Sequence, residues 1–192
     1  YETESLKKQI VDNRFETAEF EEYADIYVVN SCTVTSIADK KTRNMLRRAK
    51  KLNEDSVVIA TGCYAQTNGE ELSKIEEIDY VVGNTDKNAI FNLITKIERE
   101  ETLPKLIVKN IFDEKIYEEI EFSTLREMSR AYIKIQDGCN NFCSYCKIPF
   151  ARGGNRSRKL NSILEEVETL AKDGFKEIIL IGINLGAYGE DL

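Results

Sequence analysis

The chain contains no histidine, and no stretch of it approaches the length of an apolar membrane span. A helix that crosses a bilayer needs about 20 apolar residues. No apolar leader with a cleavage site opens the sequence either, so we expect no membrane contact. The missing histidine removes the usual nitrogen ligand of structural zinc sites. The five cysteines are an odd number and therefore favour a reducing compartment over a disulfide scaffold. We predict the cytoplasm.

The chain also lacks a broad positive charge. Its net charge is −7 and its pI is about 4.9, which argues against nonspecific nucleic-acid binding by the whole surface. Locally, residues 40–51 carry seven basic side chains and no acidic one, and a second basic cluster follows the last cysteine. From these two runs we predict weak RNA contacts by Arg43, Arg47, Lys50, Arg156 and Arg158. The alternative is that both runs are solvated faces.

Strand and helix patterns alternate along the 192 residues, a length that suits one large or two modest domains. This alternation predicts an α/β fold with parallel sheets and crossover helices. The expected strands are residues 24–30, 57–61, 80–82, 132–136 and 177–182, and the expected helices are residues 37–52, 70–77, 87–99 and 160–173.

The least distinctive stretch contains Pro104 and mixed charge, which is typical of a linker. We therefore predict an amino-terminal domain of residues 1–103, a linker of residues 104–130 and a second domain of residues 131–192.

Cys32 and Cys63 each follow one of the expected strands of the first domain. The carboxyl ends of parallel strands lie on one edge of a sheet, so both thiols are expected at the same rim. Such a pair has two interpretations. The thiols are either ligands of a metal centre or inert buried cysteines.

The spacing Cys139-x3-Cys143-x2-Cys146 is the most informative motif. Thiolates are soft ligands that suit iron-sulfur clusters, and three of them on one loop can hold three irons of a cubane and leave the fourth iron open to a reactant. The alternatives are a zinc site that borrows a fourth thiolate from elsewhere and three structural thiols without a ligand.

The run Cys139-Asn-Asn-Phe-Cys143-Ser-Tyr145-Cys146 resembles the cluster loop of radical S-adenosylmethionine (SAM) enzymes. The resemblance implies that Tyr145 lies beside the adenine of SAM, a position that suits a flat amphipathic ring. It also implies that the second domain begins a partial (β/α)6 barrel.

Four further segments narrow the resemblance to the methylthiotransferases: residues 29–35, 60–66, 135–139 and 148–158. This family implies two 4Fe-4S clusters. Cys139, Cys143 and Cys146 would hold the first together with SAM. Cys32 and Cys63 would hold an auxiliary cluster, whose third cysteine is expected before Tyr1.

Residues 182–191 resemble the subgroup that acts on N6-threonylcarbamoyladenosine in tRNA, and they imply SAM contacts by Gly182 and Asn184. A plain turn is the alternative role for these two residues. The chain departs from the subgroup at Asn184, where histidine is frequent, and at Lys147, where an aliphatic residue is usual. The related groups act on isopentenyladenosine in tRNA or on an aspartate of a ribosomal protein.

The expected reaction replaces a hydrogen on the C2 carbon of the modified adenine by a methylthio group, which calls for radical chemistry. The implied partners are tRNA, SAM and a reducing donor such as a flavodoxin or ferredoxin. The chain does not begin with Met and offers only two barrel strands, so we expect a fragment that is inactive alone, with an RNA-binding domain outside it. A different class, a noncatalytic iron-sulfur or zinc-stabilised RNA-binding module, stays open.

Overall fold

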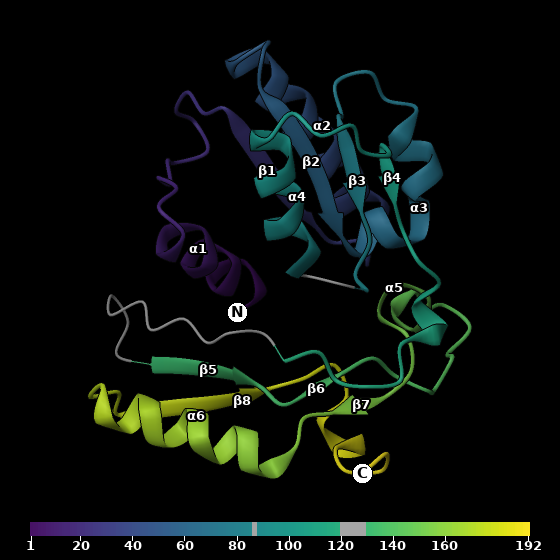
Figure 1. The fold of residues 1–192 in the computed structure, drawn as a ribbon. Helices are drawn as coiled ribbons and strands as arrows, with labels where there is room; N and C mark the ends of the chain where they lie inside the picture. Colours follow the sequence, from purple (N-terminus) through teal and green to yellow (C-terminus); the bar gives the residue numbers. More distant parts are fainter. Residues whose placement is uncertain (86–87, 120–129) are drawn as a thin grey trace.

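The computed structural model describes residues 1–85, 88–119 and 130–192. A four-stranded parallel sheet with its helices lies above a smaller layer that contains a second pair of parallel strands (Figure 1). The strands of the large sheet run in the order β1-β2-β3-β4. Its elements are α1 (Glu2–Asp12), β1 (Ile26–Ser31), α2 (Ser36–Leu52), β2 (Val57–Gly62), α3 (Cys63–Ser73), β3 (Tyr80–Val82), α4 (Asn88–Glu98) and β4 (Leu106–Ile107).

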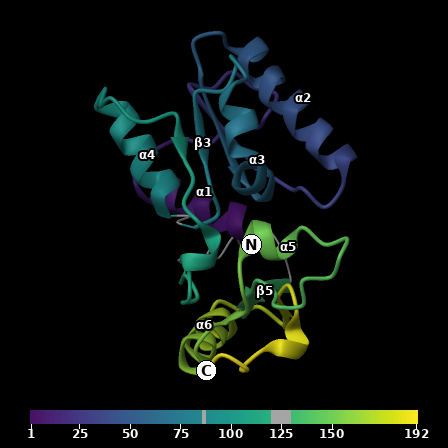
Figure 2. The same cartoon turned by 90° about the vertical axis from the view of Figure 1, so that its right-hand side faces the viewer.

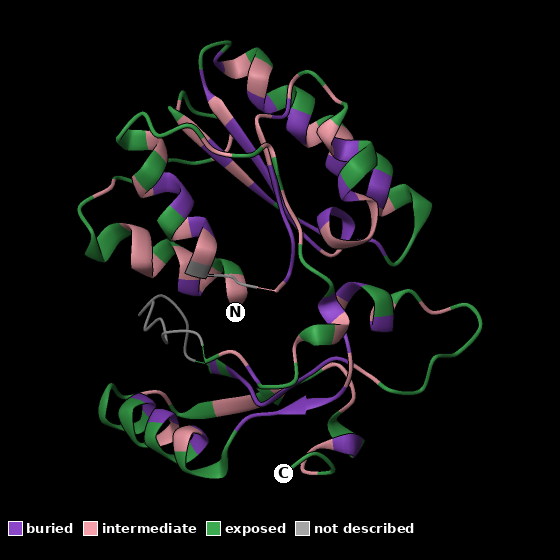
Figure 3. Ribbon diagram, turned by 45° about the vertical axis from the view of Figure 1, so that its right-hand side comes forward, coloured by how far each residue is buried: buried purple, intermediate pink, exposed green. Residues whose placement is uncertain are grey.

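Helices cover both faces of this sheet, and alternate residues of its strands point to opposite faces. Tyr27, Val29 and Val58 pack in a core with α2 and α3. Val28 and Ile59 belong to the opposite core, which includes residues of α1 and α4. Buried residues accordingly follow the central strands in Figure 3. The result is a three-layer arrangement with every strand carboxyl end on one edge.

The lower layer is built around a strand-helix-strand unit. Strands β5 and β8 pair in parallel, and Ile133 on β5 packs with Leu170 on the connecting helix α6. Strands β6 and β7 form a short antiparallel pair beside this unit. The elements are η1 (Ile111–Asp113), β5 (Arg130–Lys134), β6 (Gln136–Asp137), α5 (Ile148–Arg152), β7 (Arg156–Ser157), α6 (Leu160–Lys172), β8 (Glu177–Ile181) and η2 (Leu185–Ala187).

The predicted α/β class with a parallel sheet is confirmed, but where a helix is expected at residues 70–77, helical residues begin at Cys63, continue across a kink at Asn68 and end at Ser73. The side chain of Ser31 causes this shift, since its Oγ accepts the backbone N–H groups of Tyr64 at 3.2 Å and Ala65 at 3.4 Å. These are the orphan donors of a helix start. Cys63 is therefore the first residue of a helix.

The domain boundaries stay a prediction. Strand β4, inside the predicted linker, pairs with β3 of the large sheet. Residues 120–129 of that linker, and the expected helix start at Lys87, lie outside the described residues.

Candidate metal and cofactor site

The Cys139 loop leaves the end of β6 through Gly138. This glycine has a φ of +71°, and an added Cβ would lie 1.9 Å from the carbonyl oxygen of Gly154, so no side chain fits there. The loop is then tied down by backbone bonds, from Cys139 N–H to the Gly153 carbonyl at 3.1 Å and from Cys146 N–H to the Cys143 carbonyl at 2.9 Å. Its thiols are free and half-buried or exposed.

Three phenylalanine rings support the middle of this loop. Phe142 lies between the first two cysteines, and its ring stacks on Phe112 of η1 with centroids 6.1 Å apart. Phe150 of α5 meets both rings edge-on, at 5.9 and 6.1 Å. Such pairs contribute about 0.5–1.5 kcal/mol each beyond their buried area. The aromatic contacts hold the loop, and its cysteines stay accessible.

The segment after β8 reaches the same place. The backbone N–H of Asn184 donates to Oε1 of the buried Gln136 at 2.7 Å, and its side-chain amide lies 3.9 Å from the Cys139 sulfur. Gly182 lies against Gln136, since an added Cβ would be 2.9 Å from Oε1. The Tyr145 ring is 88% exposed. Of the predicted SAM contacts, Asn184 and Gly182 therefore adjoin the start of the cysteine loop, and Tyr145 projects into solvent.

Cys32 and Cys63 follow the ends of two neighbouring strands. Ser31 and Gly62, the residues directly before them, are paired in the parallel ladder of β1 and β2. Gly62 has a φ of +92°, and an added Cβ would lie 2.5 Å from the Ser31 carbonyl oxygen. The two strand ends are thus packed closely. Cys32 is exposed and Cys63 is half-buried.

The structure brings these two cysteine regions together across the two layers. The side-chain amide of Asn84 donates to the Cys63 sulfur at 3.5 Å and to the Ala151 carbonyl of α5 at 2.9 Å. Lys147, directly after the last loop cysteine, lies 3.8 Å from Asp39 near the start of α2. Figure 2 shows α5 directly below α3. Cys63 and the segment that directly follows the loop cysteines therefore border the junction between the layers.

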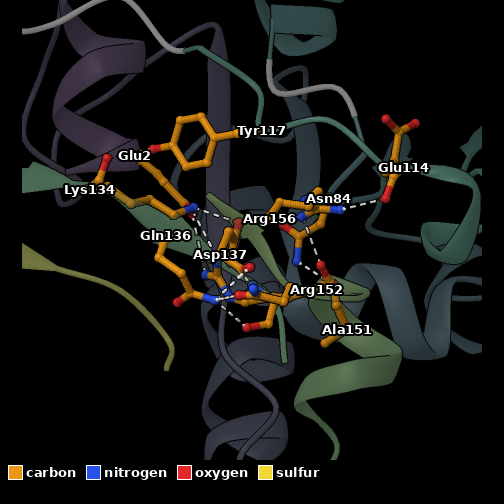
Figure 4. A network of polar contacts seen from close by, with 12 residues as sticks. Glu2, Asn84, Glu114, Tyr117, Lys134, Gln136, Asp137, Ala151, Arg152 and Arg156 are labelled. Carbon is orange, nitrogen blue, oxygen red and sulfur yellow. Dashed lines mark hydrogen bonds and ion pairs between the residues drawn. The ribbon is translucent and has the colours of Figure 1, made fainter. Parts of the chain in front are cut away.

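A buried charge cluster joins α1 to the lower layer (Figure 4). Glu2 pairs with Lys134 at 2.7 Å and with Arg152 at 2.9 Å. Asp137 pairs with Lys134 at 2.6 Å, with Arg152 at 3.1 Å and with Arg156 at 3.7 Å. Burial alone lowers the pKa of Arg152, but Asp137, Glu2 and Cys63 raise it by more, so the guanidinium stays charged.

Sequence reasoning missed the roles of Glu2, Asn84 and Asp137 in this junction. The signal available was small. Asp137 precedes Gly138 and Asn84 follows Gly83 at a strand end, both of them positions where polar residues approach a site. Glu2 carried no signal, because its partners are far away in the sequence.

The predicted RNA contacts have different surroundings. Arg156 and Arg158 are 6% and 5% exposed. Arg156 donates to the Arg152 carbonyl at 2.8 Å, and Arg158 pairs with Glu119 at 2.7 Å and also with Glu166. In this structure both guanidiniums are buried and paired within the protein, and their contact with RNA stays a prediction.

The three basic residues predicted on α2 are each paired with an acid. Arg43 lies 4.0 Å from Glu71, Arg47 lies 3.6 Å from Glu77, and Lys50 lies 3.2 Å from Asp79. Arg43 also donates to the Tyr64 hydroxyl and lies over its ring, 5.6 Å from the centroid. By contrast, Lys40, Lys41 and Lys51 are exposed and form no ion pair with any residue of the described ranges.

The donor set suits iron-sulfur clusters. Within the described parts of the chain, no three cysteine or acidic side chains converge closely enough to hold a single metal ion. A cubane binds each thiolate to a different iron, so its ligands need not converge on one point. Free thiols on a braced loop, whose Cys139 end meets the side-chain amide of Asn184 and follows Gly138, fit such a cluster better than a zinc ion.

Two family models match the chain. Residues 1–83 match the uncharacterized protein family UPF0004, and residues 133–190 match the radical SAM superfamily. No helix within residues 1–85, 88–119 and 130–192 is long and apolar enough to span a membrane.

Relatives match the chain along its entire length. The threonylcarbamoyladenosine tRNA methylthiotransferase MtaB of Bacillus subtilis is 44% identical over 100% of the chain and 42% of its own length. The protein of the same name from Aquifex aeolicus is 42% identical over 100% of the chain and 46% of its own. The chain thus spans less than half the length of these relatives.

A solved structure shares the fold. The radical SAM methyltransferase TsrM from Kitasatospora setae, with cobalamin and a [4Fe-4S] cluster bound, superposes with a TM-score of 0.63 at 18% identity, over 97% of the chain and 47% of its own. By these matches the chain is similar along its whole length to methylthiotransferases, and residues 133–190 carry the match to the radical SAM superfamily. The relatives at 42% and 44% identity are threonylcarbamoyladenosine tRNA methylthiotransferases.

Proposed function

We propose that this chain is part of an enzyme that adds a methylthio group to C2 of N6-threonylcarbamoyladenosine beside the anticodon of tRNA. The observation that carries the proposal is the meeting of Cys63 with α5, the helix that follows the Cys139 loop, through the two bonds of Asn84. A reaction that activates a carbon and then delivers sulfur to it needs both centres near one substrate.

Cys139, Cys143 and Cys146 would hold a cluster with SAM, and Cys32 and Cys63, with a third cysteine outside the chain, would hold the auxiliary cluster. When bound, the two clusters supply the electron that cleaves SAM and the sulfur that is transferred. The Tyr145 ring, 88% exposed, is free to cover the adenine of SAM. Asn184 offers a side-chain amide beside Cys139, and Gly182 of the same segment lies against Gln136. We further propose a flavodoxin or ferredoxin as electron donor and the cytoplasm as the location.

Mass spectrometry of tRNA nucleosides from a strain that lacks the protein tests the substrate. We expect the methylthio form of threonylcarbamoyladenosine to disappear and its precursor to accumulate. If methylthio-isopentenyladenosine disappears instead, or if only a ribosomal-protein aspartate loses its modification, the substrate belongs to a related group.

Metal analysis tests the class. A complete anaerobic preparation should contain about eight irons with matching sulfide, as two cubanes require. Stoichiometric zinc in their place would support a noncatalytic RNA-binding module.

A further inference from the structure

Asn84, just after β3, touches both cysteine regions through one buried side chain. Its amide nitrogen donates to the Cys63 sulfur at 3.5 Å and to the Ala151 carbonyl oxygen at 2.9 Å. An asparagine amide has two N–H groups, so both are used. The residue is only 7% exposed, so little water competes for these bonds.

The surrounding chain fixes Asn84 in this orientation. Its backbone N–H donates to Oε1 of Gln66 at 2.8 Å, and the Gln66 amide donates onward to the Lys109 carbonyl at 2.9 Å. Gly83 allows this approach, because an added Cβ would lie 2.4 Å from the same Oε1 atom. Asn84 is therefore held from α3, the helix that Cys63 begins, and from α5.

A positive charge near Cys63 acts in the same direction as this hydrogen bond, because both stabilise negative charge on the sulfur. The charged guanidinium of Arg152 lies close enough to Cys63 for the two to interact. The potential of an iron-sulfur cluster depends on hydrogen bonds to its sulfurs and on nearby charge. An N–H donor and a cation at a ligand sulfur both favour the reduced, more negative form.

We propose that Asn84 is a positioning residue for the auxiliary cluster: one N–H binds the Cys63 thiolate and raises the reduction potential, and the other fixes that thiolate relative to α5. This rests on the proposed function, because it takes Cys63 as a cluster ligand. The corresponding amide at the other centre, Asn184, lies 3.9 Å from the Cys139 sulfur, a longer contact that we expect to influence its cluster less.

The test is an EPR-monitored redox titration of the full-length protein with both clusters loaded. Asn84→Asp keeps the shape, removes both donors and adds a negative charge. We expect the reduction equilibrium constant of the auxiliary cluster to fall about tenfold, a shift of about 59 mV to lower potential for one electron. Asn84→Ala removes the donors without adding charge and should shift the potential less, in the same direction.

Asn53→Asp is the matched control. Asn53 is also a 7% exposed asparagine of the large sheet's domain, and its amide donates to the Ala24 carbonyl at 3.0 Å, away from every cysteine. It should leave both potentials unchanged. The cluster at Cys139 provides an internal reference in each sample.

Unchanged auxiliary potentials in both Asn84 variants would overturn the proposal and leave the proposed function standing. A wild-type protein with a single cluster would instead overturn both. If neither variant retains the auxiliary cluster, circular dichroism and thermal melting decide: a wild-type fold supports the positioning role, and a lost fold reduces Asn84 to a structural residue.

Discussion

At the scale of single residues, two glycines with positive φ differ in their surroundings. Gly138 has a φ of +71° and a carbonyl oxygen 1.9 Å from an added Cβ, whereas Gly174 has a φ of +91° and nothing within 4 Å. We expect Gly174→Ala to lower the free energy of unfolding by about 1–2 kcal/mol, the cost of the left-handed backbone. Gly138→Ala should cost about 1–3 kcal/mol more, because the clash adds overpacking. Denaturant titration measures the free energy of unfolding of both variants. Equal losses would contradict the close packing of Gly138 against the Gly154 carbonyl.

The three loop cysteines are expected to be individually essential. Replacing Cys139, Cys143 or Cys146 by Ala leaves one iron of the proposed cluster without its thiolate, so reductive SAM cleavage should be abolished. The measurement is 5′-deoxyadenosine formed after reduction of the reconstituted full-length protein. Normal yield from any of the three variants would refute the assignment.

Cys32 and Cys63 should behave differently from the loop cysteines. They lie at the rim of the large sheet rather than on the loop after β6. Cys32→Ala and Cys63→Ala should therefore spare SAM cleavage yet stop sulfur insertion. Product analysis by mass spectrometry, run beside the 5′-deoxyadenosine assay, separates the two steps. Methylthiolated product at the normal rate from either variant would show that the auxiliary site lies elsewhere.

At the scale of elements, α2 illustrates both what a pattern predicts and what it leaves open. Its bounds agree with the expected residues 37–52 to within one residue, and the apolar Leu46 and Ala49, three residues apart, are fully buried, whereas Ile37 near its start is 79% exposed. The spacing of Arg43, Arg47 and Lys50 also puts them on one face. The acids that meet this face come from residues 71–79, and no local pattern announces such distant pairs.

These ion pairs change which side chains should test RNA binding. Replacing the exposed Lys40, Lys41 and Lys51 by Gln in the full-length protein should flatten the salt dependence of tRNA binding by about 0.7–0.9 for each phosphate that a lysine no longer neutralises. Replacing Arg43, Arg47 and Lys50 should flatten it less, because carboxylates already neutralise them. Binding isotherms at several salt concentrations give both slopes. Two unchanged slopes would make the whole of α2 a solvated face.

The elements that sequence reasoning missed are α1, α5 and the two-residue strands β4 and β7. Helix α5 has only five residues and Pro149 near its start, so it is too short to show a period. Helix α1 has a weaker apolar stripe, and its role depends on Glu2, whose partners follow more than 130 residues later. The cysteine motifs, in contrast, were evident because their ligand spacing is local. The contact that Asn84 makes between Cys63 and α5 could not be predicted, because these residues are far apart in the sequence.

At the scale of the whole molecule, Glu2 ties the first helix to the lower layer. Its carboxylate is buried between Lys134 and Arg152. Glu2→Gln leaves these cations with only part of their compensation, so we expect a loss of about 3–5 kcal/mol in the free energy of unfolding of the full-length protein. Glu4→Gln on the same helix is the control and should change stability by less than about 0.5 kcal/mol. Calorimetry measures both, and similar small effects would show that the cluster of charges does not hold the layers together.

Helix α5 belongs to both cysteine regions, since Asn84 reaches it from the large sheet and the Cys139 loop leads directly into it. Under the proposed function this one short helix adjoins both sites, so a displacement of it at one site is also a displacement at the other, and the occupancies of the two sites are linked.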